Sequence, residues 1–286
     1  HGSIGRRVYN IVSTVFLIGL CLLMLAPLVR VFCESVSGKT YVQNNAVLFW
    51  PKGFTLEAYR VVMSGYSIMT ALKNSVFVTA VGTLLSLAMT TLLAYPLSRP
   101  EFMFKKPLLL MVTITMIFTA PMIPTYLLVK ALQLDNTLWS VMLPTTISAF
   151  NFFIMRSFFM GLPNELVEAA RIDGCGEFMI LLRIVLPLSK ASFATLGLFY
   201  GVGYWDALQQ PLIYLRDPSV YTLQIQLFNM LSSIDEDAVN AISQIQLATD
   251  TVKMATIVVT ILPILIVYPF LQKYFVTGAT LGSVKE

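Results

Sequence analysis

Residues 161–187 read GLPNELVEAARIDGCGEFMILLRIVLP. This stretch carries the start and stop signals of a short helix. Asn164 is placed to cap the first turn, where Glu165 and Glu168 suit the positive end of the helix dipole. Gly174 is placed to end the helix in a left-handed conformation. A helix of about nine residues is marginally stable alone in water, so we expect it to pack against something else.

The predicted helix has one weakly polar face on which two alanines leave the helix backbone accessible to close approach. Leu166 and Ala170 lie four residues apart and share this face, and Ala169 and Ile172 extend it. Because alanine side chains are short, another protein can approach the helix backbone closely here. We expect this face to meet the packing partner that the helix needs.

The rest of the chain is strongly apolar. Of its 286 residues, 57% are hydrophobic and only 12% are charged, and the mean hydropathy is +0.76. Soluble domains carry roughly 25% charged residues. The apolar residues also fall in blocks near bilayer length, and lipid leaves the backbone no partner except its own helix. We therefore predict an all-α integral membrane protein.

Six blocks have roughly the 17–25 residues that a transmembrane helix needs. Between them lie two predicted outer loops, about 33–72 and 207–251, and a loop at about 161–183; residues 1–286 form one predicted domain. The basic start could belong to a signal peptide, but no small-residue cleavage site lies near Pro27, which favours a retained first span. The predicted spans are Ile11–Phe32, Lys73–Leu97, Pro107–Leu132, Leu138–Met160, Ile184–Asp206 and Lys253–Phe275. Three prolines interrupt the third and fourth spans, as ordinary kinks or to open a cavity: Pro121, Pro124 and Pro144.

Basic residues predict the orientation. The short segments on one side of the alternating spans are rich in arginine and lysine, which places that side and both termini in the cytoplasm. The net charge of +4 comes from these flanking residues rather than from a basic stripe, so no nucleic-acid partner is expected. The flanking residues are Arg6, Arg7, Arg99, Lys105, Lys106, Arg156, Arg171, Arg183, Lys190, Lys273 and Lys285.

Glu168-Ala169-Ala170 is followed after three residues by Gly174, and after nine more by Ile184, Leu186 and Pro187. This pattern resembles the EAA loop of binding-protein-dependent ABC importer permeases, and no position departs from it. The resemblance covers spans two to six well, and the first span and outer loop poorly. It implies a type I ABC importer permease, with six transmembrane helices and a cytoplasmic coupling helix, in the bacterial cytoplasmic (inner) membrane.

The resemblance also implies a mechanism. In this family the short helix docks into a cleft on an ATPase subunit and moves with it when two ATPases close on ATP. By this analogy Glu168 makes a polar contact with the ATPase, while Ala169 and Ala170 permit close docking. Gly174 supplies the turn between two short helices, and Pro187 marks the entry into the fifth span.

The implied partners are a second homologous permease subunit that completes a heterodimer, two cytoplasmic ATPase subunits, an extracytoplasmic solute-binding protein and the lipid bilayer. The chain lacks a Gly-x-x-x-x-Gly-Lys-Ser/Thr loop, so ATP and Mg must bind to the ATPase subunits. His1 is its single histidine, and no paired-Asp or Ser-Lys constellation lies in the spans. We expect no enzyme activity, no cofactor and no metal on this chain.

The end of the chain suggests the cargo. Residues 272–286 read QKYFVTGATLGSVKE and resemble the tail of the maltose-type carbohydrate permeases, as does Asn74-Ser75. This implies transport of a sugar or oligosaccharide. Gly278 and Gly282 match a helix-dimerisation spacing, but their place in a polar tail favours an extended segment near the ATPase interface.

Four residues are candidates for the substrate pathway: Asn151, Tyr204, Trp205 and Asp206. Aromatic faces and a carboxylate suit sugar rings and hydroxyls, and polar groups inside a membrane are often functional. Asn151 has a plainer interpretation as a helix–helix hydrogen bond, and Trp205 as an interfacial anchor with Trp50 and Trp139. The acidic run 235–237 is either a solvated loop or a contact for the binding protein.

Two other functions remain open. The same importer class could carry a polyamine, phosphate or amino acid. A six-helix membrane receptor or passive channel is the second alternative, and it predicts no ATPase partner.

Overall fold

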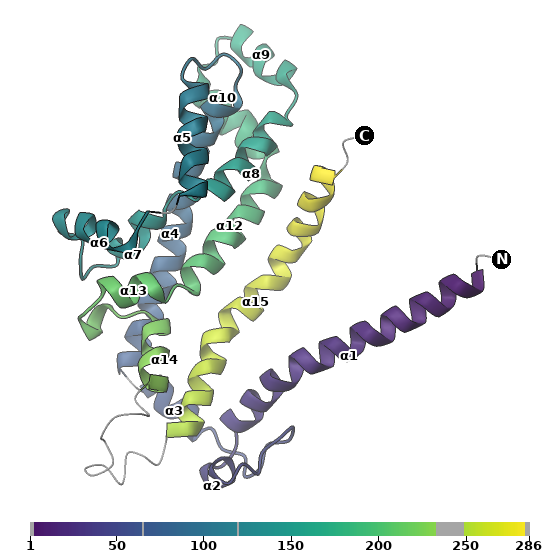
Figure 1. Ribbon diagram of the computed structural model, residues 1–286, viewed down its shortest axis with the longest axis vertical. Helices are drawn as coiled ribbons and strands as arrows, with labels where there is room; N and C mark the ends of the chain where they lie inside the picture. The colour runs from purple at the N-terminus through teal and green to yellow at the C-terminus, as the bar shows by residue number, and fades with distance from the viewer. Residues whose placement is uncertain (1–2, 65, 119, 233–248, 284–286) are drawn as a thin grey trace. The chain divides into compact units, whose positions relative to one another are not determined.

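The computed structural model describes residues 3–64, 66–118, 120–232 and 249–283, and all regular structure in this part is helical. The predicted all-helical chain is therefore confirmed for these residues. Contacts divide the chain into two compact units, residues 1–69 with 227–263 and residues 70–226 with 264–286. Figure 1 labels the helices of both.

The first unit contains α1 (Ser3–Ser35), α2 (Lys39–Gln43) and α3 (Glu57–Ser64). It also holds most of α14 (Leu223–Ser232) and the start of α15 (Thr249–Ser283). Helix α1 includes a candidate membrane span over Gly5–Ser35. Most of its side chains are exposed, whereas Cys33, Glu34 and Ser35 at its end are buried. Such a helix is apolar on all sides, as lipid requires.

The second unit is built on α4 (Tyr66–Ser98), a candidate span over Ile68–Ser98. The chain continues through α5 (Lys105–Ile117) and α6 (Met122–Ala131). It then forms α7 (Trp139–Met142), a short 3₁₀ turn and α8 (Ala149–Met160). Helix α8 packs on both α5 and α12, and Arg156 Nε on α8 donates to the Leu97 carbonyl at the end of α4 over 2.9 Å.

The remaining helices of this unit are α9 (Asn164–Ile172), α10 (Glu177–Ile180), α11 (Leu186–Leu188), α12 (Lys190–Trp205) and α13 (Gln209–Tyr214). A π-helical turn (Leu181–Val185) joins α10 to α11. In Figure 1, α9 and α10 lie at the same end of this unit as the start of α5, and α13 lies toward the other end.

Two helices are long and apolar enough to cross a membrane, or four if each bent pair counts as one span, within the described residues. The bent pairs are α5 with α6, and Glu177–Leu188 with α12. Pro121 lies at the start of α6, where its missing N–H and fixed φ favour a helix break. The prediction of an interruption in the third span is confirmed.

The predicted interruption of the fourth span, Leu138–Met160, at Pro144 is confirmed. Pro144 sits in the 3₁₀ turn after α7, and Ser148 is extended with its Oγ accepting the Asn151 N–H as the cap of α8. A proline and a capping serine each favour a new helix start. The predicted helix over Ile184–Asp206 is wrong at its start, because the helical run begins at Glu177 and bends by 84° before Lys190.

The predicted outer loops contain several helices, including α2, α3, α13 and α14. The expected extended tail is likewise wrong, because α15 continues to Ser283 and includes the backbone of Gly278 and Gly282. Residues 272–283 contain no proline, so every residue keeps its N–H for a helical bond, and each glycine costs the helix only about 1 kcal/mol. The acidic run 235–237 lies outside the described residues.

Candidate functional site

The short helix predicted after Pro163 is α9, and it presents an exposed face. Val167 and Ala170 are buried in the core of the second unit. Leu166 and Ile172 are 44% and 86% exposed, and Glu168 and Ala169 are exposed as well. The low face available to a partner therefore includes Leu166, Ala169 and Ile172, whereas Ala170 holds the helix on its own unit.

Helix α9 starts one residue earlier than predicted. Pro163 is its cap residue and makes no side-chain hydrogen bond, so Asn164 is the first helical residue. The predicted capping role of Asn164 is wrong. Pro163 has φ −57 and ψ 125, an extended conformation that proline's ring favours and that turns the chain into the helix.

The predicted left-handed end at Gly174 is confirmed. Gly174 has φ +80. Its N–H donates to the Arg171 carbonyl over 3.0 Å, and the Cys175 N–H donates to the Ala170 carbonyl over 2.9 Å. These two bonds form a Schellman motif, which satisfies carbonyls left free at the helix end. The motif reverses the chain between α9 and α10.

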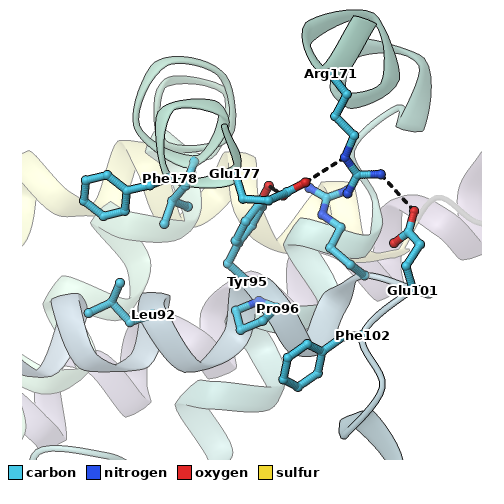
Figure 2. A pocket seen from close by; sticks show the side chains of 10 residues that line it. Leu92, Tyr95, Pro96, Glu101, Phe102, Arg171, Glu177 and Phe178 are labelled. Carbon is cyan, nitrogen blue, oxygen red and sulfur yellow. Dashed lines mark hydrogen bonds and ion pairs between the residues drawn. The ribbon is translucent and has the colours of Figure 1, made fainter. Parts of the chain in front are cut away.

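Arg171, in the last turn of α9, is bound to two carboxylates. Its Nε donates to Glu177 Oε1 on α10 over 2.7 Å, and its Nη1 donates to Glu101 Oε1 in the α4–α5 turn over 3.0 Å. The Tyr95 hydroxyl on α4 donates to Glu177 Oε2 over 2.7 Å. Figure 2 shows the chain of contacts. We call these four residues the α9 clamp, because they tie α9 to α4, to the α4–α5 turn and to α10.

The charges of the clamp are fixed at neutral pH. Glu101 accepts its own backbone N–H and the Arg171 guanidinium, and these bonds hold the pKa of Glu101 below its ordinary value. The hydrogen bonds from Arg171 to Glu177 and Glu101 raise the pKa of Arg171 above its ordinary value. Both partners therefore stay ionised.

The end of the Glu168–Pro187 pattern lies at the bend before α12. Ile184 is half-buried in the π-helical turn, and Leu186 and Pro187 belong to α11. Pro187 provides no N–H for a helical bond, and Ser189 has φ −99 and ψ 18 between α11 and α12. The pattern thus links α9 to the 84° bend before α12, at residues 186–189, which we call the elbow.

A pocket of about 410 Å³ lies beside the clamp. Figure 2 shows Leu92 and Phe178 at one side of it and the Arg171–Glu101 pair at the other. Its lining also includes Arg99, whose side chain is buried. The pocket is therefore apolar at one end and charged at the other.

A second cavity, of about 240 Å³, contains two of the predicted pathway residues. Asn151 and Tyr204 line it together with Thr145, Tyr200 and Gln210. The Asn151 side chain makes no hydrogen bond with any residue that the structure describes, although its backbone N–H is capped by Ser148. The interpretation of Asn151 as a bond between helices finds no partner in this part of the chain.

Tyr204, by contrast, connects helices. Its hydroxyl lies 2.9 Å from Ser86 Oγ on α4 and donates to the Met142 carbonyl over 3.1 Å. Tyr200, one turn earlier, lies 2.7 Å from Thr90 Oγ1 on α4. The two tyrosines hold α4, α7 and α12 together and form one wall of the cavity.

Trp205 and Asp206 do not line this cavity. Trp205 is buried, and its carbonyl accepts a bond from Gln224 Nε2 over 3.2 Å. Asp206 is exposed at the end of α12. The structure therefore brings together Asn151 and Tyr204 but leaves the other two predicted residues outside.

Sequence reasoning missed the partners of Arg171 and the role of Tyr200. Glu101 is 70 residues from Arg171, and no local pattern links residues so far apart. The contacts of Tyr200 and Tyr204 with α4, by contrast, have a signature in the sequence. Ser86 and Thr90 are four residues apart, as are Tyr200 and Tyr204, and such spacing places each pair on one helix face.

Residues 98–280 match the family model described as "Binding-protein-dependent transport system inner membrane component". The chain is 39% identical over 283 residues to the polygalacturonan/rhamnogalacturonan transport system permease protein YtcP of Bacillus subtilis (strain 168), with 98% of this chain and 99% of that protein covered. It is 31% identical to the arabinooligosaccharides transport system permease protein AraQ of Halalkalibacterium halodurans, with 98% and 99% covered.

The fold is similar to a solved chain as well. A chain from a bacterial ABC transporter involved in the import of the acidic polysaccharide alginate superposes with a TM-score of 0.89 at 30% identity. The match covers 96% of this chain and 99% of that one.

Proposed function

Because the chain belongs to the family of binding-protein-dependent transport system inner membrane components, we propose that it translocates an oligosaccharide delivered by an external binding protein. It is the permease subunit of an ABC importer, lies in the inner membrane and is not itself catalytic. Members of this family carry no cofactor, and ATP is hydrolysed elsewhere in the complex.

The exposed face of α9 carries the proposed mechanism. Leu166, Ala169 and Ile172 present a low apolar surface on a helix that the Schellman turn and the α9 clamp hold in place. A short helix fixed at one end of a membrane protein suits docking in a cleft of an ATPase. In this proposal Glu168 adds a polar contact, and Ala170 anchors α9 to the permease instead of touching the ATPase.

The α9 clamp and the elbow provide two routes from α9 to the membrane helices. Glu101 precedes α5, Tyr95 belongs to α4, and the α10–α11 segment leads to α12. When ATP draws two ATPases together, α9 moves with its partner and biases the state of the bundle. Such coupling requires only that ATP favour one of two arrangements.

We further propose six membrane-spanning segments in one permease domain, with both termini in the cytoplasm. The broken stretches α5–α6, α7–α8 and α10–α12 each account for one of these, beside α1, α4 and α15. A second, homologous permease subunit would complete a heterodimer above two ATPase subunits. The cavity lined by Asn151 and Tyr204 is the proposed contribution of this chain to the pathway between the two permeases.

The cargo proposal depends on the relatives, whose descriptions name transport systems for polygalacturonan/rhamnogalacturonan and for arabinooligosaccharides, and import of the acidic polysaccharide alginate. Asn151 supports it, because its free amide can both donate and accept hydrogen bonds with sugar hydroxyls. The cavity supplies aromatic rings from Phe199 and Tyr204 for a sugar to pack against.

The test is ATP hydrolysis by the complete complex in lipid vesicles, stimulated by its binding protein. The binding protein would be loaded in turn with oligogalacturonides, arabino-oligosaccharides, a polyamine, phosphate or an amino acid. We expect an oligosaccharide to stimulate hydrolysis and to be taken up. Ile172→Glu should abolish stimulation, whereas Met103→Glu, at an equally exposed apolar site in the α4–α5 turn, should not.

The other outcomes are equally informative. Stimulation by a polyamine, phosphate or amino acid alone would replace the proposed cargo and keep the importer. A complex in which Ile172→Glu binds and stimulates the ATPase normally would overturn the docking face. A chain that never binds an ATPase would point to a receptor or channel.

A further inference from the structure

Arg99 directly follows α4, and its guanidinium has an unusual environment. Its side chain is 6% exposed, yet its Nε and Nη2 atoms have no hydrogen-bond partner among the residues that the structure describes. Its guanidinium carbon lies 5.0 Å from the centre of the Tyr95 ring. A buried guanidinium is strongly driven to find acceptors, because unmade bonds to a charged donor are costly. The ring satisfies none of these N–H donors.

The neighbouring carboxylates are already used. Glu101 and Glu177 both accept from Arg171, and Glu177 also accepts from Tyr95. Arg99 forms no ion pair with either of them, although its charge interacts with both at longer range. Arg99 lines the 410 Å³ pocket, so a molecule that enters the pocket can supply acceptors to its Nε and Nη2 atoms.

The opposite end of that pocket is apolar and open. Leu92 and Phe178 are 52% and 64% exposed and stand together on the side away from Arg171 in Figure 2. Leu92 belongs to the candidate span Ile68–Ser98, and Phe178 and Leu181 belong to the bent pair that precedes α12. An occupant that lies along these residues lies at the edge of the hydrocarbon layer.

We propose that this pocket binds the headgroup of an anionic phospholipid, with the phosphate on Arg99 and the upper acyl chain along Leu92, Phe178 and Leu181. The inference rests on the membrane placement and the orientation proposed above. In that orientation Arg99 lies at the cytoplasmic headgroup level, where anionic lipids are attracted by basic residues. A phosphate provides several acceptor oxygens for a guanidinium fork. The pocket volume suits a headgroup and the first part of a chain rather than a whole lipid.

Lipid binding here would act on the α9 clamp. Tyr95 and Glu177 line the pocket and belong to the clamp. A lipid phosphate on Arg99 would bring negative charge close to Glu177, which is bound to Arg171 and Tyr95. The anionic lipid content of the membrane would then influence how firmly α9 is held.

The test is native mass spectrometry of the permease–ATPase complex released from nanodiscs of phosphatidylcholine with a minor fraction of phosphatidylglycerol. We expect the wild-type complex to retain phosphatidylglycerol in preference to phosphatidylcholine. Arg99→Gln should lower that retention about fivefold, the loss of one basic contact. Leu92→Trp, which fills the apolar end without changing charge, should lower it similarly. Lys106→Gln, an exposed basic residue at the same end that does not line the pocket, should retain the wild-type level.

Equal retention by the wild type, Arg99→Gln and Leu92→Trp would overturn the proposal. So would displacement of the lipid by millimolar inorganic phosphate, because the site would then need no acyl chain. Leu92→Trp keeps the test decisive if Arg99→Gln fails to fold. Binding-protein stimulation of ATP hydrolysis, measured on the same samples, separates the two proposals. Its absence would count against the proposed function, whereas retention of lipid reports on the pocket alone.

Discussion

Gly174 and Gly176 stand two residues apart and have different backbone requirements. Gly174 has φ +80, whereas Gly176 has φ −71, which any residue adopts. A Cβ added at either position would meet no atom within 4 Å. Steric contact therefore cannot distinguish them, and only the left-handed conformation at Gly174 can.

We expect Gly174→Ala to destabilise the turn by about 1 kcal/mol, the cost of a left-handed Cβ. This corresponds to a fall of a few degrees in the melting temperature of the purified complex. Gly174→Asn should lose less, because asparagine tolerates this conformation. Gly176→Ala serves as the matched control and should melt as the wild type does. Equal melting temperatures for both alanine variants would contradict the turn.

A second glycine is required by close packing. A Cβ on Gly82 of α4 would lie 2.9 Å from two ring carbons of Tyr204. Gly82→Ala should therefore cost about 1–3 kcal/mol, as overpacking does, and lower the melting temperature of the complex. Gly197→Ala on α12 is the control, because its Cβ would meet Leu87 at an ordinary 3.6 Å.

The contact between Gly82 and the Tyr204 ring can be tested with a double-mutant cycle. In the Tyr204→Leu background, Gly82→Ala should cost less than in the wild type, because the ring that it strikes has gone. A Gly82→Ala cost that is the same in both backgrounds would show that the two residues do not contact each other.

Individual residues also show where the sequence was informative. The glycine at 174 was identified from its position after a helix pattern, because a left-handed helix end has few residue choices. The start of α9 differs from the prediction by one residue, because Pro163, directly before Asn164, supplies the non-helical backbone of the cap. The α9 clamp was not foreseen, since its acceptor Glu101 comes from a turn 70 residues away.

At the scale of elements, the α9 clamp connects three helices and one turn through a single guanidinium. Exposed ion pairs contribute little to stability, typically below about 1 kcal/mol. Their effect here is expected in coupling rather than in folding, because α9 must not slip relative to α4 and α5. Removing Arg171 leaves two carboxylates without a shared cation.

Arg171→Gln should leave ATPase binding near the wild-type level but lower the amount of sugar transported per ATP by about tenfold, within the usual range of coupling energies. Arg183→Gln is the matched control, an exposed arginine of the same segment with no ion pair among the described residues. Transport and hydrolysis would be measured together in vesicles. A parallel fall in both, with their ratio unchanged, would refute a coupling role.

The sign of the pH dependence follows from Glu101. The pKa of Glu101 is lowered in the folded chain. The Arg171–Glu101 ion pair is therefore fully formed above the ordinary carboxyl pKa, and it is lost only as the pH falls through the lowered pKa. The wild-type transport ratio should therefore stay constant between neutral and mildly acidic pH.

Helix existence was easier to predict than helix continuity. Apolar runs of bilayer length identified the helical stretches, since lipid leaves the backbone no alternative. Pro121 and Pro144 marked the places of the breaks. The bend before α12 is not evident from the sequence, because Pro187 also suits the entrance to a span, whereas the helical run already begins at Glu177.

At the scale of the whole molecule, the proposed orientation is open to a direct test with cysteines. Cys175 is exposed between α9 and α10, and Cys33 is buried. In a background with Cys21 and Cys33 changed to serine, a membrane-impermeant maleimide should label Cys175 in inside-out vesicles and not in intact spheroplasts. Labelling should fall when the ATPase is bound.

The side of the membrane opposite Cys175 needs its own labelling site. Lys52 is exposed in the segment after α2, which was predicted to lie outside. Lys52→Cys, in a chain without the native cysteines, should be labelled in spheroplasts only. Labelling of both sites from the same side would contradict the alternation of spans on which the proposed orientation depends.

The π-helical turn Leu181–Val185 gives the spacing of the Glu168–Pro187 pattern a further meaning. Such a turn holds one residue more than an α turn, and each helical residue advances the chain by about 100° of rotation. The nine residues between Gly174 and Ile184 therefore set a phase as well as a length. A deletion of one helical residue here would rotate α9 by about 100° relative to the elbow, away from a partner whose cleft has not moved. The length of this interval is therefore more tightly constrained by the docking geometry than the identity of its residues.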